Sequence, residues 1–140
     1  MLRIGCIILS IWSGIQFIAS VMSLAASFIG KYAPMMKMVF TDEEISSIDS
    51  KVLGVTKALA INHNTGATIF SLFSIIIIWF ALNNGQKWSF WGLLILGLFS
   101  HIIWFLSDSL IGNKSLVVNV ILLLIFVIGI SLSGIGLFNK

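Results

Sequence analysis

Four long apolar segments follow one another along the chain, separated by shorter polar stretches. They cover residues 4–29, 58–82, 88–107 and 115–138. Each is roughly 20–26 residues long, and about 20 apolar residues suffice for a helix to cross the hydrocarbon core of a membrane. The alternation of polar and apolar positions that is typical of membrane barrels is missing. The pattern predicts an all-α, polytopic integral membrane protein: an antiparallel bundle of four transmembrane helices in one domain, residues 1–140.

Two of the connections between these segments are short and polar. Residues 83–87 and 108–114 contain the glycine and asparagine residues that favour tight turns. The helices on either side of each turn are therefore expected to be antiparallel neighbours. The first apolar segment is too long for the core of a signal peptide, which holds about 7–15 residues, so we expect it to remain as a span.

The first connection, residues 30–57, is long and carries most of the acidic residues. Pro34 is expected to end the preceding helix, because proline lacks a backbone donor and clashes with the turn before it. Thr41, followed three residues later by Glu44, is the pattern of a capping box at the start of a helix. We expect a short amphipathic helix over about residues 42–53, lying on the membrane surface or over the bundle.

The composition agrees with a membrane location and excludes other classes of protein. The 140 residues are 59% hydrophobic and 9% charged, with a net charge of +3. These charges are too few to cover a soluble domain, and no basic patch could follow a nucleic-acid backbone. We expect a multi-pass protein of a bacterial inner membrane. The net charge of the connections favours cytoplasmic N- and C-termini, although the basic residues alone point the other way.

Polar residues inside the predicted spans form the candidate site. Counted from the helix ends, His63, His101 and Asn119 fall roughly 7–11 Å below the surface that carries the long connection. Polar groups in membrane helices cost free energy and usually face a bundle interior or a cavity. We therefore expect a polar pocket in this half of the membrane, and an apolar half beside the 83–87 turn. The candidate ligand-binding residues are His63, His101, Asn64, Trp104, Asp108, Asn119 and Ser23.

Plainer interpretations compete at several positions. Two polar stripes would join helices through hydrogen bonds worth about 0.6 kcal/mol each. The stripes are Gln16, Ser20, Ser23 and Ser27 in the first span, and Asn64, Thr68 and Ser71 in the second. Gly129 and Ser133 are expected to pack against another helix. Most tryptophans, Trp12 among them, are expected in the interfacial belts, whereas Trp104 could stack on a ligand.

Three functions from different classes are compatible with this pattern. The first is binding of an amphipathic or lipid-like small molecule, for sensing, carrying or transport. The second is a structural or assembly subunit. The third is an intramembrane enzyme that uses His63 or His101 as acid or base on a lipid-soluble substrate, although no nucleophile or catalytic motif is evident. The catalytic residues of such an enzyme stay unknown.

The sequence also sets expectations for partners. These are membrane lipid, a hydrophobic or amphipathic small molecule, and a homodimer or a larger membrane complex. Two distant histidines give a partial ligand set for zinc, so we expect no metal. We likewise expect no cofactor and no nucleic acid as a partner.

Overall fold

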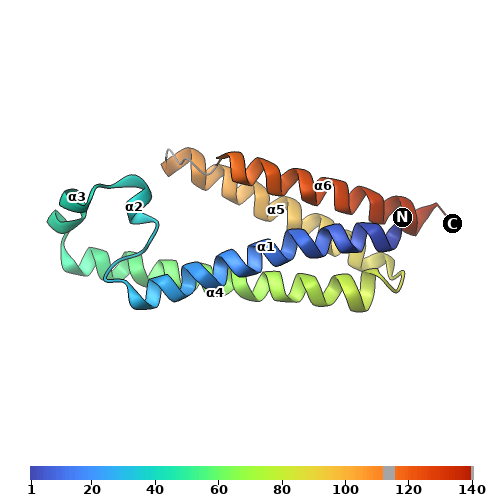
Figure 1. Ribbon diagram of the computed structural model, residues 1–140, viewed down its shortest axis with the longest axis horizontal. Helices are drawn as coiled ribbons and strands as arrows, with labels where there is room; N and C mark the ends of the chain where they lie inside the picture. The colour runs from blue at the N-terminus through green and yellow to red at the C-terminus, as the bar shows by residue number, and fades with distance from the viewer. Residues whose placement is uncertain (112–115, 140) are drawn as a thin grey trace.

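The computed structural model describes residues 1–111 and 116–139 and confirms the all-helical membrane bundle. Its long helices are α1 (Leu2–Ile29), α4 (Ser50–Ile77), the π-helical continuation η1 (Ile78–Leu82), α5 (Lys87–Ile111) and α6 (Leu116–Phe138). They form four segments that are long and apolar enough to cross a membrane. The two termini lie at the same end of the molecule (Figure 1). Residues 112–115, in the connection expected before the fourth span, lie outside the described residues.

The central helix of the bundle is α1. It packs along α4 on one side and along α6 on the other, while α5 packs against α6. The expected neighbours α4 and α5 are joined by the tight turn. Their contact is made mainly between α5 and η1, the continuation of α4. Two arms result, an α1–α4 arm and an α5–α6 arm. They meet at the end that carries the termini and diverge toward the other end (Figure 1).

Small residues let α1 and α6 approach closely near the termini. A Cβ atom added to Gly5 would lie 2.8 Å from the carbonyl oxygen of Gly129, and one added to Gly129 would lie 3.1 Å from the backbone nitrogen of Leu9. Ser133 faces Gly5 at the same seam. The packing role expected for Gly129 and Ser133 is therefore confirmed. The core beside this seam consists of Cys6, Leu9, Trp12, Ile78, Leu82, Leu93, Leu122, Phe126, Ile130 and Leu137.

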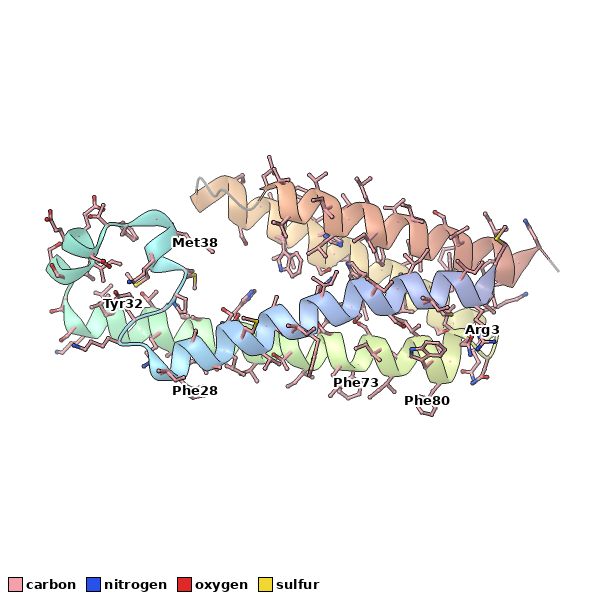
Figure 2. The ribbon with its side chains drawn as sticks, in the orientation of Figure 1. Arg3, Phe28, Tyr32, Met38, Phe73 and Phe80 are labelled. Carbon is pink, nitrogen blue, oxygen red and sulfur yellow. The ribbon has the colours of Figure 1, made fainter. Side chains whose placement is uncertain are left out.

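The polar stripes of the first two spans face each other between α1 and α4. Three hydrogen bonds cross the contact, from Asn64 Nδ2 to Ser23 Oγ (3.1 Å), from Thr68 Oγ1 to Ser20 Oγ (3.0 Å) and from Ser13 Oγ to the Ser71 carbonyl oxygen (2.8 Å). These bonds fix the antiparallel register of the two helices. Phe73 of α4 and Phe80 of η1 are exposed and point away from the bundle (Figure 2).

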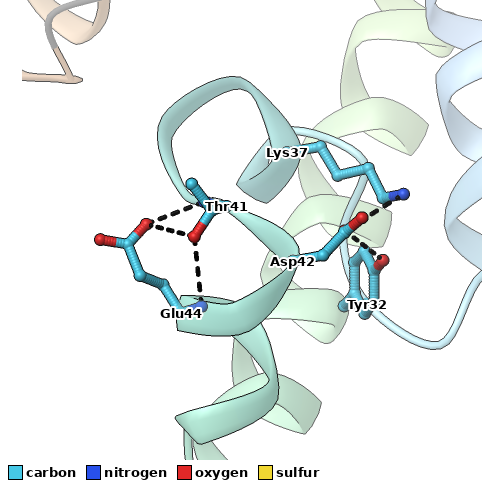
Figure 3. A network of polar contacts seen from close by, with 5 residues as sticks. All are labelled: Tyr32, Lys37, Thr41, Asp42 and Glu44. Carbon is cyan, nitrogen blue, oxygen red and sulfur yellow. Dashed lines mark hydrogen bonds and ion pairs between the residues drawn. The ribbon is translucent and has the colours of Figure 1, made fainter.

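Two short helices, α2 (Met36–Val39) and α3 (Asp42–Ser47), occupy the first connection. The expected capping box is confirmed at the start of α3 (Figure 3). The Thr41 side chain accepts a hydrogen bond from the Glu44 backbone N–H, and the Glu44 carboxylate accepts one from the Thr41 backbone N–H at 2.8 Å. These bonds satisfy donors that the first turn of a helix leaves free.

The helix expected over residues 42–53 is divided in two. Ile48 and Asp49 are not helical, and the Asp49 carboxylate caps a new helix by accepting a hydrogen bond from the Lys51 backbone N–H at 2.8 Å. For this reason α4 begins at Ser50, earlier than the span expected from the apolar pattern. A small core of Ala33, Met36, Ile45 and Ala60, with Tyr32, Ile48 and Leu53 against it, ties the connection to the start of α4.

Candidate functional site

The side chain of His101, in α5, is held by α1. Trp12 Nε1 donates a hydrogen bond to His101 Nε2 at 3.1 Å, and both side chains are buried. An indole nitrogen is a donor and never an acceptor, so His101 Nε2 must be the acceptor and the proton of the neutral ring must be on Nδ1. The contact with Trp12 therefore selects one tautomer of His101.

Aromatic rings surround this pair. The Phe126 ring centroid lies 4.8 Å from that of Trp12 and 5.7 Å from that of His101. Trp104 contacts His101 edge-on, with centroids 5.6 Å apart. Gly97, one helical turn before His101, leaves the space that Phe126 occupies, because an added Cβ atom would overlap the Phe126 ring. The cluster therefore joins α1, α5 and α6 in one layer.

Two buried nitrogen atoms, His101 Nδ1 in this cluster and Gln16 Nε2 of α1, have no hydrogen-bond partner among the described residues. Gln16 follows Trp12 by one turn on the buried face of α1 and is 5% exposed. Both atoms are donors, since the ring proton is on Nδ1 and the other is an amide nitrogen. A buried donor without an acceptor costs about 1–3 kcal/mol. Two buried donors are therefore left without an acceptor in the described part of the chain.

His63 and His101 lie at different depths in the bundle. Asn64, next to His63, bonds to Ser23 of α1, whereas His101 bonds to Trp12 of the same helix. Trp12 and Ser23 are 11 positions apart, which corresponds to roughly 16 Å along a helix. The equal depth expected for the two histidines is therefore wrong, because α1 continues 17 residues beyond Trp12 whereas α5 continues 10 residues beyond His101. The side chain of His63 is exposed.

The other predicted site residues fall into two groups. Trp104 contacts the cluster histidine, and Asn119 is buried on α6. Ser23 and Asn64 bond to each other and join α1 to α4. Asp108 lies within α5, and its side chain is outside the described part of the structure.

Trp12 is the residue of this site that the sequence analysis misplaced. It is completely buried rather than part of an interfacial belt. The periodicity of α1 carries the missing signal, because Trp12 precedes Gln16 by four positions and so shares the face of the polar stripe. The buried residues of this face are Gly5, Cys6, Leu9, Trp12, Ser13, Gln16, Ser20 and Ser27.

A second feature lies at the C-terminal end of α1, where an open hollow of about 320 Å³ is lined by Ala26, Gly30, Lys31, Tyr32, Pro34 and Lys37. The Tyr32 hydroxyl donates a hydrogen bond to Asp42 Oδ1 at 3.4 Å, and Lys37 Nζ lies 3.4 Å from the same oxygen (Figure 3). The pKa of Lys37 is raised above its ordinary value, first by hydrogen bonding with Tyr32 and to a smaller extent by hydrogen bonding with Asp42. The Lys57 ammonium donates to the Gly30 carbonyl oxygen at 2.6 Å.

No family model, curated protein or solved structure matches this chain. Within residues 1–111 and 116–139, no group of three or more His, Cys, Asp and Glu side chains is placed to hold a metal ion. The interpretation of the site therefore rests on its own geometry.

Proposed function

We propose that this protein binds an amphipathic, lipid-like molecule inside the membrane, between the α1–α4 arm and the α5–α6 arm, for sensing, carrying or transport. The observation that supports the proposal most directly is the pair of buried donors, His101 Nδ1 and Gln16 Nε2, that have no acceptor in the described structure. Polar groups inside a membrane are expensive, and they often mark a ligand site. A matching ligand has an apolar body and uncharged acceptor oxygens, such as carbonyl oxygens.

The arrangement of the helices supports the same position. The close α1–α6 seam, where Gly129 packs on Leu9, extends as far as the contact between Trp12 and Phe126. Away from the end that carries the termini, the two arms diverge (Figure 1). Asn119 lies two turns before Phe126 on α6 and is also buried. A ligand bound beside this contact would therefore meet aromatic rings and polar groups together.

The substitution Gln16→Leu tests the proposal. Polymer nanodiscs extract the protein with its surrounding membrane, and mass spectrometry then identifies the small molecules that it retains. We expect the wild-type protein to retain a compound that the variant loses. The free variant should unfold at an equal or higher temperature, because it no longer buries an unpaired amide. A merely structural role for Gln16 predicts no change in retained compounds.

The control for this experiment is Ser71→Ala. Ser71 is also buried, but its hydroxyl already donates to the Ala67 carbonyl oxygen of its own helix at 2.8 Å. We expect this variant to retain the same compound as the wild-type protein. Loss of the compound in both variants, or its retention in both, would contradict a specific role of Gln16.

Assembly is a second candidate function, and the outward face of α4 favours it. This face exposes polar and small residues within a predicted span, namely Asn62, His63, Thr65 and Gly66. Small residues permit close helix contacts, and polar side chains hydrogen-bond across them. In a Cys6→Ala background, Thr65→Cys should form one specific crosslinked product in native membranes. The control is Leu59→Cys, an exposed position about 120° around α4 from Thr65, and equal crosslinking at both positions would count against assembly through this face.

A further inference from the structure

Basic groups outnumber acidic groups around the hollow at the end of α1. Lys31 and Lys37 line it, and Lys57 reaches its Gly30 wall. Over the described residues, the one ion pair joins Lys37 to Asp42. Lys57 bonds to a carbonyl oxygen at the C-terminal end of α1, where it offsets the negative end of the helix dipole that would otherwise repel an anion. The hollow therefore keeps a positive charge that its neighbours do not neutralise.

The same hollow lies where a predicted span ends. α1 ends at Ile29, and Phe28 and Ile29 are 64% and 89% exposed. Phe28, Tyr32 and Met38 are found together at this end of the molecule (Figure 2). Exposed apolar side chains next to lysines and a tyrosine are typical of the membrane–water interface. A charged group in the hollow would thus lie at the level of lipid headgroups, with apolar side chains available to acyl chains.

We propose that this hollow binds the phosphate of an anionic lipid headgroup, such as that of phosphatidylglycerol. Its volume of about 320 Å³ is within the range of small-molecule sites, about 300–1,000 Å³. The ammonium groups of Lys31 and Lys37 and the hydroxyl of Tyr32 would contact the phosphate oxygens. Asp42 competes for two of these donors, so it weakens the site. The proposal is independent of a ligand at Gln16 and His101.

Native mass spectrometry tests the proposal on the whole protein, reconstituted in vesicles of phosphatidylcholine and phosphatidylglycerol and then released. The measured quantity is the ratio of the two lipids that stay bound. We expect the wild-type protein to prefer phosphatidylglycerol. The double variant Lys31→Gln, Lys37→Gln should have a lower ratio of bound phosphatidylglycerol to phosphatidylcholine, by about five-fold for each lysine removed. Asp42→Asn should raise it, because it releases Lys37 and Tyr32. Lys51→Gln, at an exposed lysine outside the hollow, should leave it unchanged.

Three results would overturn the proposal. The first is a double lysine variant that prefers phosphatidylglycerol as strongly as the wild-type protein does. The second is an equal loss in Lys51→Gln, which would mean that any lysine of the connection attracts anionic lipid. The third is displacement of phosphatidylglycerol by inorganic phosphate, which would assign the hollow to a free anion. Asp42→Asn guards against misfolding as an explanation, because its expected effect has the opposite sign.

Discussion

At the scale of single residues, the hydrogen bond between Trp12 and His101 is the contact that organises the candidate site. Trp12→Phe keeps an aromatic ring in the cluster but removes the donor to His101 Nε2. Because a buried acceptor is then left unpaired, we expect the free energy of unfolding to fall by about 1–3 kcal/mol. Reversible unfolding in mixed micelles measures this change. Trp79→Phe, at a residue that is 38% exposed, is the control and should change stability much less.

The capping box of α3 predicts a local dependence on pH. Hydrogen bonds from the Thr41 backbone and hydroxyl lower the pKa of Glu44 from its ordinary value of 4.5. Because the pKa is lower in the folded state, the Glu44 carboxylate stabilises α3 fully above the ordinary value, and this stabilisation is lost as pH falls through the lowered pKa. The Thr41 amide donates to this carboxylate, so its protection factor, which is exchange corrected for the intrinsic dependence on pH, should fall in that acidic range.

Thr41→Ala provides the matched comparison for this prediction. The variant lacks the threonine hydroxyl that bonds the Glu44 carboxylate at 3.0 Å. The pKa of Glu44, followed by NMR titration, should move back toward its ordinary value. An unchanged titration in this variant would show that the hydroxyl does not contribute to the lowered pKa.

The sequence identifies most of the polar residues of the candidate site, but it does not show which of them contact one another. The stripes containing Ser20, Ser23 and Asn64 are visible as helical periodicity, which is a local property. Their pairing, and the position of His101 against Trp12, depend on how far each helix slides along its neighbour. Spacing from the ends of connections could not supply this register, because α1 continues 17 residues beyond Trp12 while α5 continues 10 residues beyond His101.

At the scale of helices, the α1–α6 seam predicts that the same change, glycine to alanine, has opposite effects on stability at two positions of α1. Gly5→Ala places a methyl group against Gly129 and Ser133, and overpacking of this kind costs about 1–3 kcal/mol. An added Cβ atom at Gly14 has nothing within 4 Å outside its own helix. Gly14→Ala should therefore be neutral or stabilising, because alanine is the better helix former. Thermal unfolding of both variants checks the difference, and equal destabilisation would contradict the close seam.

The sequence predicts which helices form better than it predicts how they pack. Residues 83–87 form the expected tight turn, with Gly85 at a φ of 78° that favours glycine. The central place of α1 and the π-helical turns of η1 were not foreseen. In a membrane, the lipid-facing surface is as apolar as the packed surface, so hydrophobic periodicity gives little information about neighbours. The polar stripe and glycines of α1 were the best available signals for its central position.

At the scale of the whole molecule, α4 and η1 are too long for a single apolar crossing. Together they contain 33 residues, roughly 50 Å at the rise of an α-helix, whereas a hydrocarbon core is about 30 Å thick. Fitting that length into the core would need a tilt of roughly 50°, beyond the range of about 0–40° seen for membrane helices. The polar 83–87 turn places the end of η1 at one surface. The start of α4 must therefore project beyond the opposite surface, together with α2 and α3.

Cysteine labelling tests this projection. In a Cys6→Ala background, Val55→Cys should react with a membrane-impermeant maleimide, and Leu72→Cys should not. Both positions are exposed on α4, at 61% and 47%, so burial within the protein does not explain a difference between them. Cytoplasmic termini, the orientation that the net charge of the connections favours, further predict that Val55→Cys reacts from outside intact cells. Equal protection of both positions would mean that the first turns of α4 are embedded, and the hollow beside Lys31 would then lie too deep for a lipid headgroup.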